Sequence, residues 1–520
     1  MAMSTGFTVL QNNRFFKTLP RKILKVSDHN TTLFICGAAL TFCYYPFNLG
    51  MLSWFLLFPL IKACHQPDPV TRLKKSFIFS IAYFAFGIYW LVLTLMHQVH
   101  FNLAVSIILE LVLAAALALA PISFCWLSGY IKTSPIINLL WLPALWIFTE
   151  DIRFQAFGGG PWISLGLSQI DTPLAGFFSI IGESGVSGLV VLMAVLIFNF
   201  IDSINKNKTR LTIYPIIFFA ILLLTGQWLK QASFTHPLSQ KIPIAMVQPA
   251  TTQQDKLNKV NPQKRLQLLQ QLSLPYLGKT RLVIWPETVI TLEKQQIEKS
   301  LSTFNRQAIE TKTTLLIGAF ELGLNQKLFN TAYTKGFEGG QVYRKRHLVP
   351  FGEYVPNMLA FLAPFVPGDT YRVVSKDTQP LAIAGELMGV TICWEGSFNR
   401  DIVPLVKNGA TVIINVANEA WFNGTSLPFQ NLDALRIRAM ESERQVIRVA
   451  NFGPGAAIDE KGQVIAQLAS NRAGVSEALI QPRVGLTPFM KLGADYILLL
   501  AFIIICTIII FTSFSKPKHE

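Results

Sequence analysis

Charged residues are scarce in this 520-residue chain: Asp, Glu, Lys and Arg make up 14% of it, whereas apolar residues make up 51%. Ordinary soluble proteins contain about 25% charged residues, so the composition excludes a simple soluble protein. The apolar residues are also segregated. Long apolar runs occupy 33–230 and 493–514, while 240–486 has the mixed composition of a globular domain. This pattern indicates a membrane protein with one large soluble domain.

Cysteine is scarce as well. The chain has six cysteines, and only Cys393 lies in the segment 240–486. A disulfide within that segment is therefore excluded. Free cysteine is among the residue types most often buried in a core, so Cys393 has a purely structural interpretation. A lone thiol beside suitable neighbours is also a candidate nucleophile, and both interpretations stay open on this evidence.

Eight segments are apolar enough to be candidate membrane spans. They lie near 33–47, 49–63, 76–96, 102–128, 135–149, 176–200, 212–229 and 493–514. If the N-terminus is cytoplasmic, fifteen Lys and Arg residues fall in cytoplasmic segments and one, Arg153, falls in the short outer loops. Because cytoplasmic loops carry an excess of positive charge, this asymmetry predicts that 240–486 lies outside the cytoplasm.

Of the net charge of +15, the segment 240–486 contributes +7, with 27 Lys and Arg against 20 Asp and Glu, and the remaining +8 lies mainly in the predicted cytoplasmic loops. No basic stripe with interleaved aromatic residues is visible, so we expect no nucleic-acid partner. Within the fourth candidate span, Glu110 is a carboxylate at membrane depth. Such a residue is a functional candidate, although a position near the outer interface would also keep it hydrated.

The segment 240–486 alternates short apolar runs with longer polar ones. Strands are predicted at 242–248, 281–287, 313–320, 388–395, 410–418 and 445–451, helices at 261–275, 292–311 and 428–445, and a hairpin turn at 459–462. Continuous apolar strands separated by helices predict an α/β domain.

Several polar residues follow these strands directly. Glu287 ends "VIWPE", Cys393 and Glu395 end "TICWE", and Asn418 ends "INVAN". In α/β sheets, chemistry gathers beyond the carboxyl ends of the strands. Each residue alone has a structural alternative, such as a helix cap.

A further segment, "YRKRHLVPFGEYVP", adds Lys345 and Glu353 beside a rigid turn, although the basic run could simply be solvated. A thiol, a carboxylate and an ammonium together suit acyl transfer. The carboxylate acts as general base for the thiol, and the ammonium stabilises the oxyanion of the intermediate.

These motifs carry a resemblance. "WPET", "YRKRHLVPFGEYVP" and "TICWE" resemble the Glu-Lys-Cys signature of the nitrilase (carbon–nitrogen hydrolase) superfamily. The resemblance implies an αββα sandwich with Glu287 as base, Lys345 as oxyanion partner and Cys393 as nucleophile. It implies no metal and no cofactor.

The wider sequence, including "PWISLGLSQIDTPLAGFF" and "NEAWFNGTSLPFQNLDALRIRAMESERQVIRVAN", is similar to the bacterial apolipoprotein N-acyltransferase family. That similarity implies a membrane domain over 1–235, an extracytoplasmic nitrilase-like domain over 240–486 and a last membrane helix over 493–514, in the bacterial inner membrane. It also implies acyl transfer from a phospholipid, through a thioester, to the α-amine of a diacylated apolipoprotein. The alternative is a membrane-anchored amidase or hydrolase that passes the acyl group to water.

The resemblance also implies supporting positions. Glu353 and Asn418 would support the site, Trp394 and Glu395 would shape the pocket beside the thiol, and Trp421 would lie near the substrate entrance. The sequence departs from the family pattern at three positions: Leu257 stands where a tryptophan is expected, Glu419 replaces an aspartate, and Phe429 replaces another aromatic residue. Tryptophans near span ends, including Trp54, Trp90, Trp126, Trp146 and Trp228, are predicted to be interfacial anchors.

Overall fold

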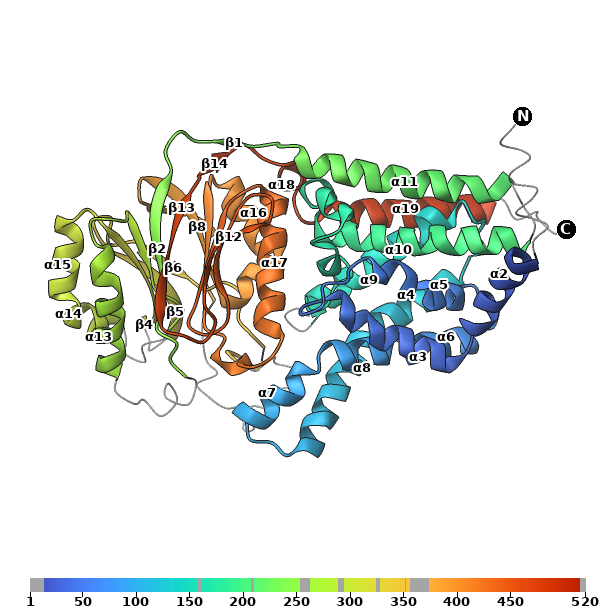
Figure 1. The fold of residues 1–520 in the computed structure, drawn as a ribbon, viewed down its shortest axis with the longest axis horizontal. Coiled ribbons are helices and arrows are strands. Elements are labelled where there is room, and N and C mark those ends of the chain that lie inside the picture. Colours follow the sequence, from blue (N-terminus) through green and yellow to red (C-terminus); the bar gives the residue numbers. More distant parts are fainter. Residues whose placement is uncertain are drawn as a thin grey trace.

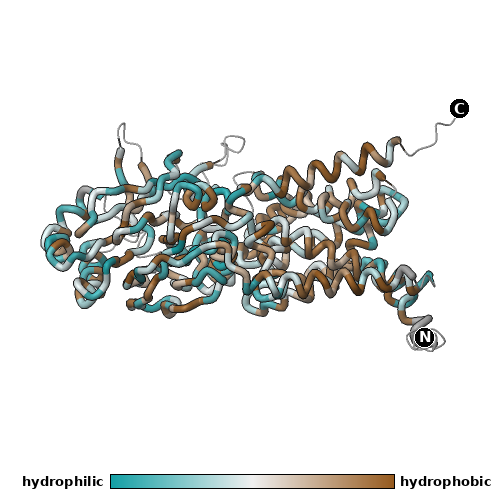
Figure 2. The backbone as a smooth tube through the Cα atoms, turned by 90° about the horizontal axis from the view of Figure 1, so that it is seen from above, coloured by the Kyte–Doolittle hydropathy of each residue, from teal (hydrophilic) through white to brown (hydrophobic). Residues whose placement is uncertain are grey.

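The protein consists of a helical region and an α/β region that lie end to end (Figure 1). The computed structural model describes residues 14–131, 133–156, 161–206, 210–252, 262–288, 294–323, 328–350, 352–355 and 374–514. Leu257, one of the departures from the family pattern, lies outside these ranges. In a view from above, the helical region is predominantly hydrophobic, whereas the α/β region mixes hydrophilic and hydrophobic residues (Figure 2).

The helical region is built from eleven α-helices within the described ranges. They are α2 (Arg14–Val26), α3 (Asn30–Ala39), α4 (Leu52–Leu56), α5 (Phe58–Cys64), α6 (Pro69–Gly87), α7 (Trp90–Gln98), α8 (Leu103–Ser128), α9 (Asn138–Gln155), α10 (Phe178–Asn205), α11 (Arg210–Gln231) and α19 (Tyr496–Phe514). The short helices η3 (Leu167–Gln169) and η4 (Pro173–Phe177) precede α10. The start of α2 and the end of α19 lie at the end remote from the α/β region (Figure 1).

Four helices are long and apolar enough to cross a membrane: α8, α10 with η4, α11 and α19. The pair α6 and α7 meets the same test as one span bent by 46°. These helices coincide with five of the eight expected spans. The expected spans at 33–47 and 49–63 fall on shorter apolar helices, and 135–149 falls on α9, which ends in charged residues. The count of eight therefore stays a prediction.

The predicted interfacial tryptophans divide into two groups. Trp126 and Trp228 are exposed on the helical surface, as expected of anchors. Trp54, Trp90 and Trp146 are almost completely buried, so for them the anchor assignment is wrong. Their rings pack against other aromatic side chains inside the protein; for example, the Trp90 ring lies 5.5 Å from that of Trp162. Apolar sequence context places a tryptophan near a span end but does not say whether it faces lipid or protein.

The α/β region contains two six-stranded sheets within the described ranges. The first has the order β13-β2-β3-β4-β5-β6 and the second β12-β11-β10-β9-β8-β7. Their bounds are β2 (Ile242–Gln248), β3 (Leu282–Ile284), β4 (Thr314–Leu322), β5 (Leu328–Gly336), β6 (Val342–Arg344), β7 (Leu381–Ile383), β8 (Glu386–Ile392), β9 (Val412–Ala417), β10 (Val446–Ala450), β11 (Gly455–Ile458), β12 (Val464–Leu468) and β13 (Gly474–Ile480). A short pair, β1 (His236–Pro237) and β14 (Arg483–Val484), joins this region to the helices.

The two sheets pack face to face through aliphatic side chains of their inner faces, which form one continuous core. Helices α13 (Pro262–Ser273), α14 (Lys294–Ser300) and α15 (Ser302–Glu310) cover the outer face of the first sheet. Helices α16 (Asn399–Lys407) and α17 (Leu427–Ser442) cover the second, with α18 (Pro488–Leu492) beside them. Figure 1 shows these four layers in order, with α17 next to the helical region. The expected αββα sandwich is therefore confirmed.

Each predicted strand and helix of this region is present, with ends shifted by a few residues. The expected helix 292–311 is broken at Leu301 into α14 and α15. The predicted hairpin turn joins β11 to β12, where the Asp459 amide donates to the Gln463 carbonyl and Gly462 has a positive φ of 79°. A positive φ is readily adopted by glycine, so the residue suits this turn.

A buried ion-pair network joins the two regions. Helix α10 is kinked at Gly182, where φ is 64°. The Glu183 amide, freed by the kink, donates to Glu441 on α17 at 2.8 Å. Arg438 on α17 forms ion pairs with both Glu183 and Glu441, and all three side chains are buried. Burial raises the pKa of Glu441 to about 7. Arg438 is thus the cation that balances two buried carboxyl groups.

We expect Arg438→Met to destabilise the protein strongly, because it leaves these carboxyl groups buried without their cation. Such a loss costs about 3–5 kcal/mol. The matched control is Arg400→Met, which also removes a cross-region ion pair, to Asp151, but at a partly exposed side chain; exposed pairs contribute about 0–1 kcal/mol. Thermal unfolding in detergent should show a large drop in midpoint for Arg438→Met only. Equal drops would contradict this account of the junction.

Candidate active site

Three of the candidate residues meet at one edge of the two sheets. Glu287 follows β3, Cys393 follows β8, and Asn418 follows β9. Strand β3 is parallel to β2 and β4, and β8 is parallel to β9. Since the carboxyl ends of parallel strands lie at the same edge, the two sheets present these side chains to a common space.

Cys393 occupies the first position of the short helix η8 (Cys393–Ser397), immediately after β8. Its φ is 54°, in the left-handed region that a residue with a side chain rarely adopts. The Asn415 side-chain amide donates to the Cys393 carbonyl at 3.0 Å and helps to hold this turn. Strained backbone of this kind is typical of functional sites, and here it places the thiol beyond the strand end.

Glu287 is buried and held by two donors. The Asn330 side-chain amide donates to one carboxylate oxygen at 2.6 Å, and the backbone N–H of Asn418 donates to the other at 2.9 Å. The two donors come from different sheets, Asn330 from β5 and Asn418 from the end of β9. The carboxylate is thereby fixed in one orientation between the sheets.

Lys345 is buried between two carboxylates. Its ammonium nitrogen lies 2.9 Å from Glu353 Oε2 and 3.5 Å from Glu287 Oε1. Burial alone lowers the pKa of Lys345, but the charges of Glu353 and Glu287 outweigh burial and raise the pKa above its ordinary value. Glu353 is itself held by Asn330 at 3.0 Å and by the Val349 amide at 2.9 Å. Lys345 is therefore a fixed cation at neutral pH.

Burial raises the pKa of the Cys393 thiol, and the negative charge of Glu287 raises it further, whereas the ammonium of Lys345 lowers it. The net direction is upward, so the resting thiol keeps its proton. A thiol in this state is a nucleophile only if a base removes the proton during the attack. Glu287 is the carboxylate whose charge acts most strongly on it.

Glu395 is completely buried, and its carboxylate is held by hydrogen bonds. Its carboxylate accepts from Tyr343 Oη at 2.8 Å, from the Ile392 amide at 2.6 Å, and from the Arg346 and His347 amides. These contacts join the turn that holds Cys393 to the strand that leads to Lys345. Burial raises the pKa of Glu395.

Trp394 is buried at the boundary with the helical region. Its ring lies 5.1 Å from that of Trp162, which belongs to the segment between α9 and α10, and 5.2 Å from Phe398. The residue next to the thiol therefore touches the helical region directly. Trp421 lies on η9 (Ala420–Phe422), outside the Glu287–Lys345 network, and the neighbouring Phe422 contacts Trp90 at 5.7 Å between ring centroids.

At two of the departures from the family pattern, Glu419 and Phe429, the side chain has clear partners in the structure. Glu419 is buried, forms an ion pair with Arg448 and accepts a hydrogen bond from Asn431 at 2.7 Å. Phe429 stacks on Tyr45 of the helical region, with 4.1 Å between ring centroids.

The sequence interpretation missed Asn330, which binds both Glu287 and Glu353. It stands in β5, whose sequence "LFNTAYTKG" mixes polar and apolar residues and for which no strand was predicted, so no sequence signal singled it out. Asn451 was also missed; its side chain donates to Asn418 Oδ1 at 3.0 Å. Within the described ranges, no group of three His, Cys, Asp or Glu side chains is placed to hold a metal ion.

We expect Asn330→Leu to slow the reaction by about 100-fold, because both carboxylates lose their shared donor and small displacements of reacting groups have effects of this size. The control is Asn408→Leu, which removes a hydrogen bond to Thr378 on the exposed surface. The rate of acyl-enzyme formation should fall for Asn330→Leu and stay near wild type for Asn408→Leu. An unchanged rate for Asn330→Leu would show that Glu287 and Lys345 are positioned without it.

Two family models match the chain. Residues 243–489 match the carbon–nitrogen hydrolase model, and residues 36–196 match the apolipoprotein N-acyltransferase N-terminal domain. The first match covers the αββα sandwich and the second covers most of the helical region.

The matched relatives span nearly the whole chain. The apolipoprotein N-acyltransferase of Pasteurella multocida is 28% identical over 86% of this chain and 89% of its own length. That of Neisseria meningitidis is 30% identical over 91% of this chain and 95% of its own length. Among solved structures, a nitrilase-superfamily protein from Saccharomyces cerevisiae covers 48% of this chain and 93% of its own, with 19% identity and a TM-score of 0.37. From its two matched regions and its full-length relatives, the chain belongs to the apolipoprotein N-acyltransferase family.

Proposed function

We propose that this N-acyltransferase takes its acyl chain from a membrane phospholipid and carries it as a thioester on Cys393. The acceptor is the α-amino group of the diacylglyceryl-cysteine at the start of an apolipoprotein. The observation that carries the proposal is the set of buried Glu287, buried Lys345 and partly buried Cys393 beside Trp394, whose ring contacts the helical region. A lipid donor reaches such a site from the membrane side.

In the first half of the reaction, Cys393 Sγ attacks the ester carbonyl carbon of the phospholipid while Glu287 accepts the thiol proton. The charge that develops on the carbonyl oxygen is stabilised by the ammonium of Lys345. The intermediate then collapses: the C–O bond of the ester breaks, and the proton on Glu287 passes to the departing oxygen. The products are a thioester on Cys393 and a lysophospholipid.

In the second half, the α-amine of the acceptor attacks the thioester carbonyl carbon. Glu287 accepts a proton from the amine, Lys345 again faces the oxyanion, and the C–S bond breaks. Cys393 leaves as a thiolate and recovers the proton from Glu287. The product is an amide. A single base and a single cation serve both halves, because each half forms and breaks a tetrahedral intermediate at one carbonyl carbon.

The test is incubation of the purified protein with phospholipid and a diacylated lipopeptide, followed by mass analysis of the peptide. We expect one added acyl chain in amide linkage, together with lysophospholipid. A free fatty acid formed in place of the acylated peptide would instead identify a hydrolase and overturn the proposal.

The domain boundaries and the orientation are part of the same proposal: a membrane domain over 1–235, a catalytic domain over 240–486 facing the periplasm, and a last inner-membrane helix over 493–514. Several basic residues gather at the end remote from the α/β region. Lys62 and Lys75 pair with Asp28 there, beside α2. Their clustering at one end supports a cytoplasmic location for that end.

We expect labelling of single cysteines by a membrane-impermeant maleimide to reflect this orientation. Position 241 is exposed in the α/β region, so the cysteine of the Lys241→Cys protein should react in intact spheroplasts. Lys206→Cys, at the far end of α10, should react only after the membrane is opened. The reverse pattern would refute the proposed topology.

A further inference from the structure

A cavity of about 240 Å³ lies between the two regions, away from the candidate active site. Its walls come from η3–η4, the outer end of α11, the C-terminal end of α17 and the turn between β11 and β12. The active-site segment around Asn418 precedes the other end of α17. That helix has 16 residues, so its two ends lie about 24 Å apart at 1.5 Å per residue. The cavity is a separate site.

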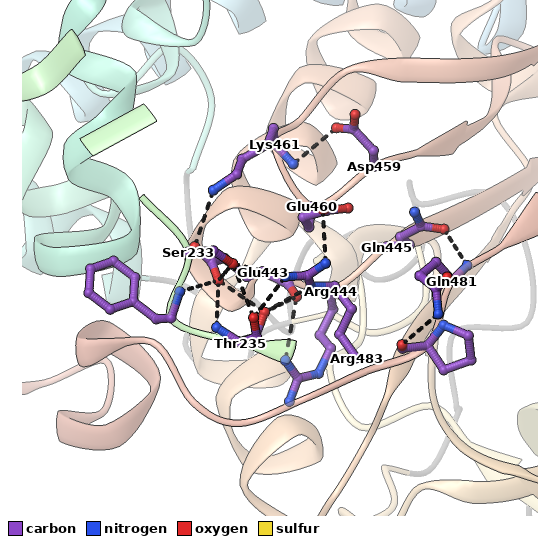
Figure 3. A network of polar contacts seen from close by, with 12 residues as sticks. Ser233, Thr235, Glu443, Arg444, Gln445, Asp459, Glu460, Lys461, Gln481 and Arg483 are labelled. Atoms are coloured by element: carbon purple, nitrogen blue, oxygen red, sulfur yellow. Dashed lines mark hydrogen bonds and ion pairs between the residues drawn. The ribbon is translucent and has the colours of Figure 1, made fainter. Parts of the chain in front are cut away.

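Glu443 and Lys461 line the cavity. Figure 3 shows the polar contacts around these two residues. Glu443 ends α17 in a left-handed conformation, with φ of 45°. One of its carboxylate oxygens accepts hydrogen bonds from the Phe234 and Thr235 amides at 2.8 and 2.9 Å. These bonds connect α17 to the linker, residues 232–235, which follows α11. The other carboxylate oxygen of Glu443 lies 3.4 Å from the Lys461 ammonium, which also donates to the Ala232 carbonyl. Lys461 is therefore held in place with a third N–H free to donate.

One basic side chain of the cavity wall, Lys230, has no direct partner within the described ranges. Each acidic residue in the wall has a basic partner: Asp171 pairs with Arg436, Glu460 with Arg483, and Glu443 with Lys461. Lys230, at the end of α11, interacts electrostatically with Asp171 but forms no hydrogen bond or ion pair within the described part of the chain. Arg436 is shared between Asp171 and Asp433. The Lys230 ammonium thus has no direct partner among the described residues, and the phosphate of a ligand in the cavity would supply one.

The shape and the surroundings of the cavity favour a phospholipid headgroup. A volume of 240 Å³ is many times the roughly 10–15 Å³ needed to hold one water molecule, so the cavity has room for a small polar group such as phosphoethanolamine. Apolar side chains, including Leu229 and Met440, share the wall with the charges. Helix α11, which carries Leu229, also exposes Leu224 by 72% and Trp228 by 66% on its lipid-facing surface. Trp228 marks the level at which headgroups lie.

We propose that this cavity binds the headgroup of a second phospholipid. Its phosphodiester contacts the ammonium groups of Lys230 and Lys461, and its primary ammonium contacts the unshared carboxylate oxygen of Glu460. The lipid chains follow the exposed surface of α11. This chemistry favours a headgroup of the phosphatidylethanolamine kind, because its primary ammonium has N–H donors for the second oxygen of Glu460, whereas a choline headgroup has none. The bound lipid would join the linker, α11 and α17 at a place remote from the acyl-transfer chemistry.

The test uses the full-length protein in detergent and native mass spectrometry with dialkyl-ether lipids, which have no acyl ester to donate. Wild type should retain the ethanolamine lipid about ten times more tightly than Lys230→Met, the effect of losing one charge-assisted contact. The matched control is Lys491→Met, at an exposed lysine on α18 that does not line the cavity. Its retention should equal that of wild type. An ether lipid with a diazirine near the glycerol should label the peptide that contains Leu229 or Met440.

Three outcomes would overturn the proposal: equal retention in Lys230→Met and wild type, equal retention of choline and ethanolamine lipids by wild type, or labelling confined to peptides around Cys393. Binding of soluble O-phosphoethanolamine as tight as that of the lipid would assign the cavity to a soluble ligand and overturn the lipid source. Lys230→Met leaves Glu287, Lys345 and Cys393 intact, so the rate of thioester formation tests the proposed function separately.

Discussion

The Cys393→Ser protein should fold and insert into the membrane, yet release no lysophospholipid and acylate no lipopeptide. We expect a rate lower by about 10⁴- to 10⁶-fold, the range seen when a covalent nucleophile is removed. A hydroxyl has a far higher pKa than a thiol, so Glu287 cannot activate it, and an ester would be a poorer donor than a thioester.

The structural interpretation of Cys393 predicts the opposite result. Serine is nearly isosteric with cysteine, and the turn at η8 depends on backbone contacts, such as the 3.0 Å bond from Asn415 to the Cys393 carbonyl. A purely structural role would therefore leave activity almost unchanged. The assay pairs lysophospholipid release with a thermal unfolding curve, which separates loss of chemistry from loss of fold. Normal turnover by the serine variant would show that the thiol is part of the core only.

Glu287→Gln should reduce acyl-enzyme formation by about 10²- to 10⁴-fold, the usual contribution of a general base. The substitution keeps the shape of the side chain, so the hydrogen bond from the Asn418 amide can persist. Because no carboxylate remains to take the proton, the variant depends on thiolate formed by the solvent. Burial keeps the pKa of the thiol high. Below that pKa the thiolate fraction rises about tenfold per pH unit, and the variant rate should rise with it.

The pH profile provides the readout that a merely structural defect would not change. Wild type, with Glu287 as base, should not show this tenfold rise per unit above pH 7. Lys345→Met should lose about 10²- to 10³-fold at every pH, because it removes an oxyanion donor and not the base. Lys345 also balances two buried carboxylates, so the thermal unfolding midpoint of the Lys345→Met protein must be measured together with its rate. A flat profile for Glu287→Gln would show that another group removes the proton.

Six strands of the α/β region, β2, β3, β4, β8, β9 and β10, could be predicted from the sequence because they are short, mainly apolar runs. Strands such as β5 and β13 mix polar and apolar residues and were not predicted. The predicted strands locate Glu287, Cys393 and Asn418 at the edge where the structure places them. Asn330 was not predicted because its role is to donate hydrogen bonds to Glu287 and Glu353, which are 43 and 23 positions away in the sequence. Only the pairing of β5 within the folded sheet reveals that contact.

The helical region was harder to predict for a physical reason. Apolar side chains face lipid and protein interior alike, so hydropathy indicates membrane depth but not packing. Trp90 and Trp228 have similar sequence surroundings, yet one is 2% exposed and the other 66% exposed. The cavity at Lys230 and Lys461 could not be predicted from the sequence for a related reason. Those lysines are 231 positions apart, and only the docking of the two regions brings them to one wall.

The central claim is that the acyl chain passes through Cys393, and one measurement tests it most directly. Wild-type protein is incubated with phospholipid alone, without acceptor, and its peptides are examined by mass spectrometry. The account predicts one acyl chain on the peptide that contains Cys393, removable by hydroxylamine, with one equivalent of lysophospholipid. An acyl chain on a different residue, or lysophospholipid formed with no acylated peptide at all, would contradict it.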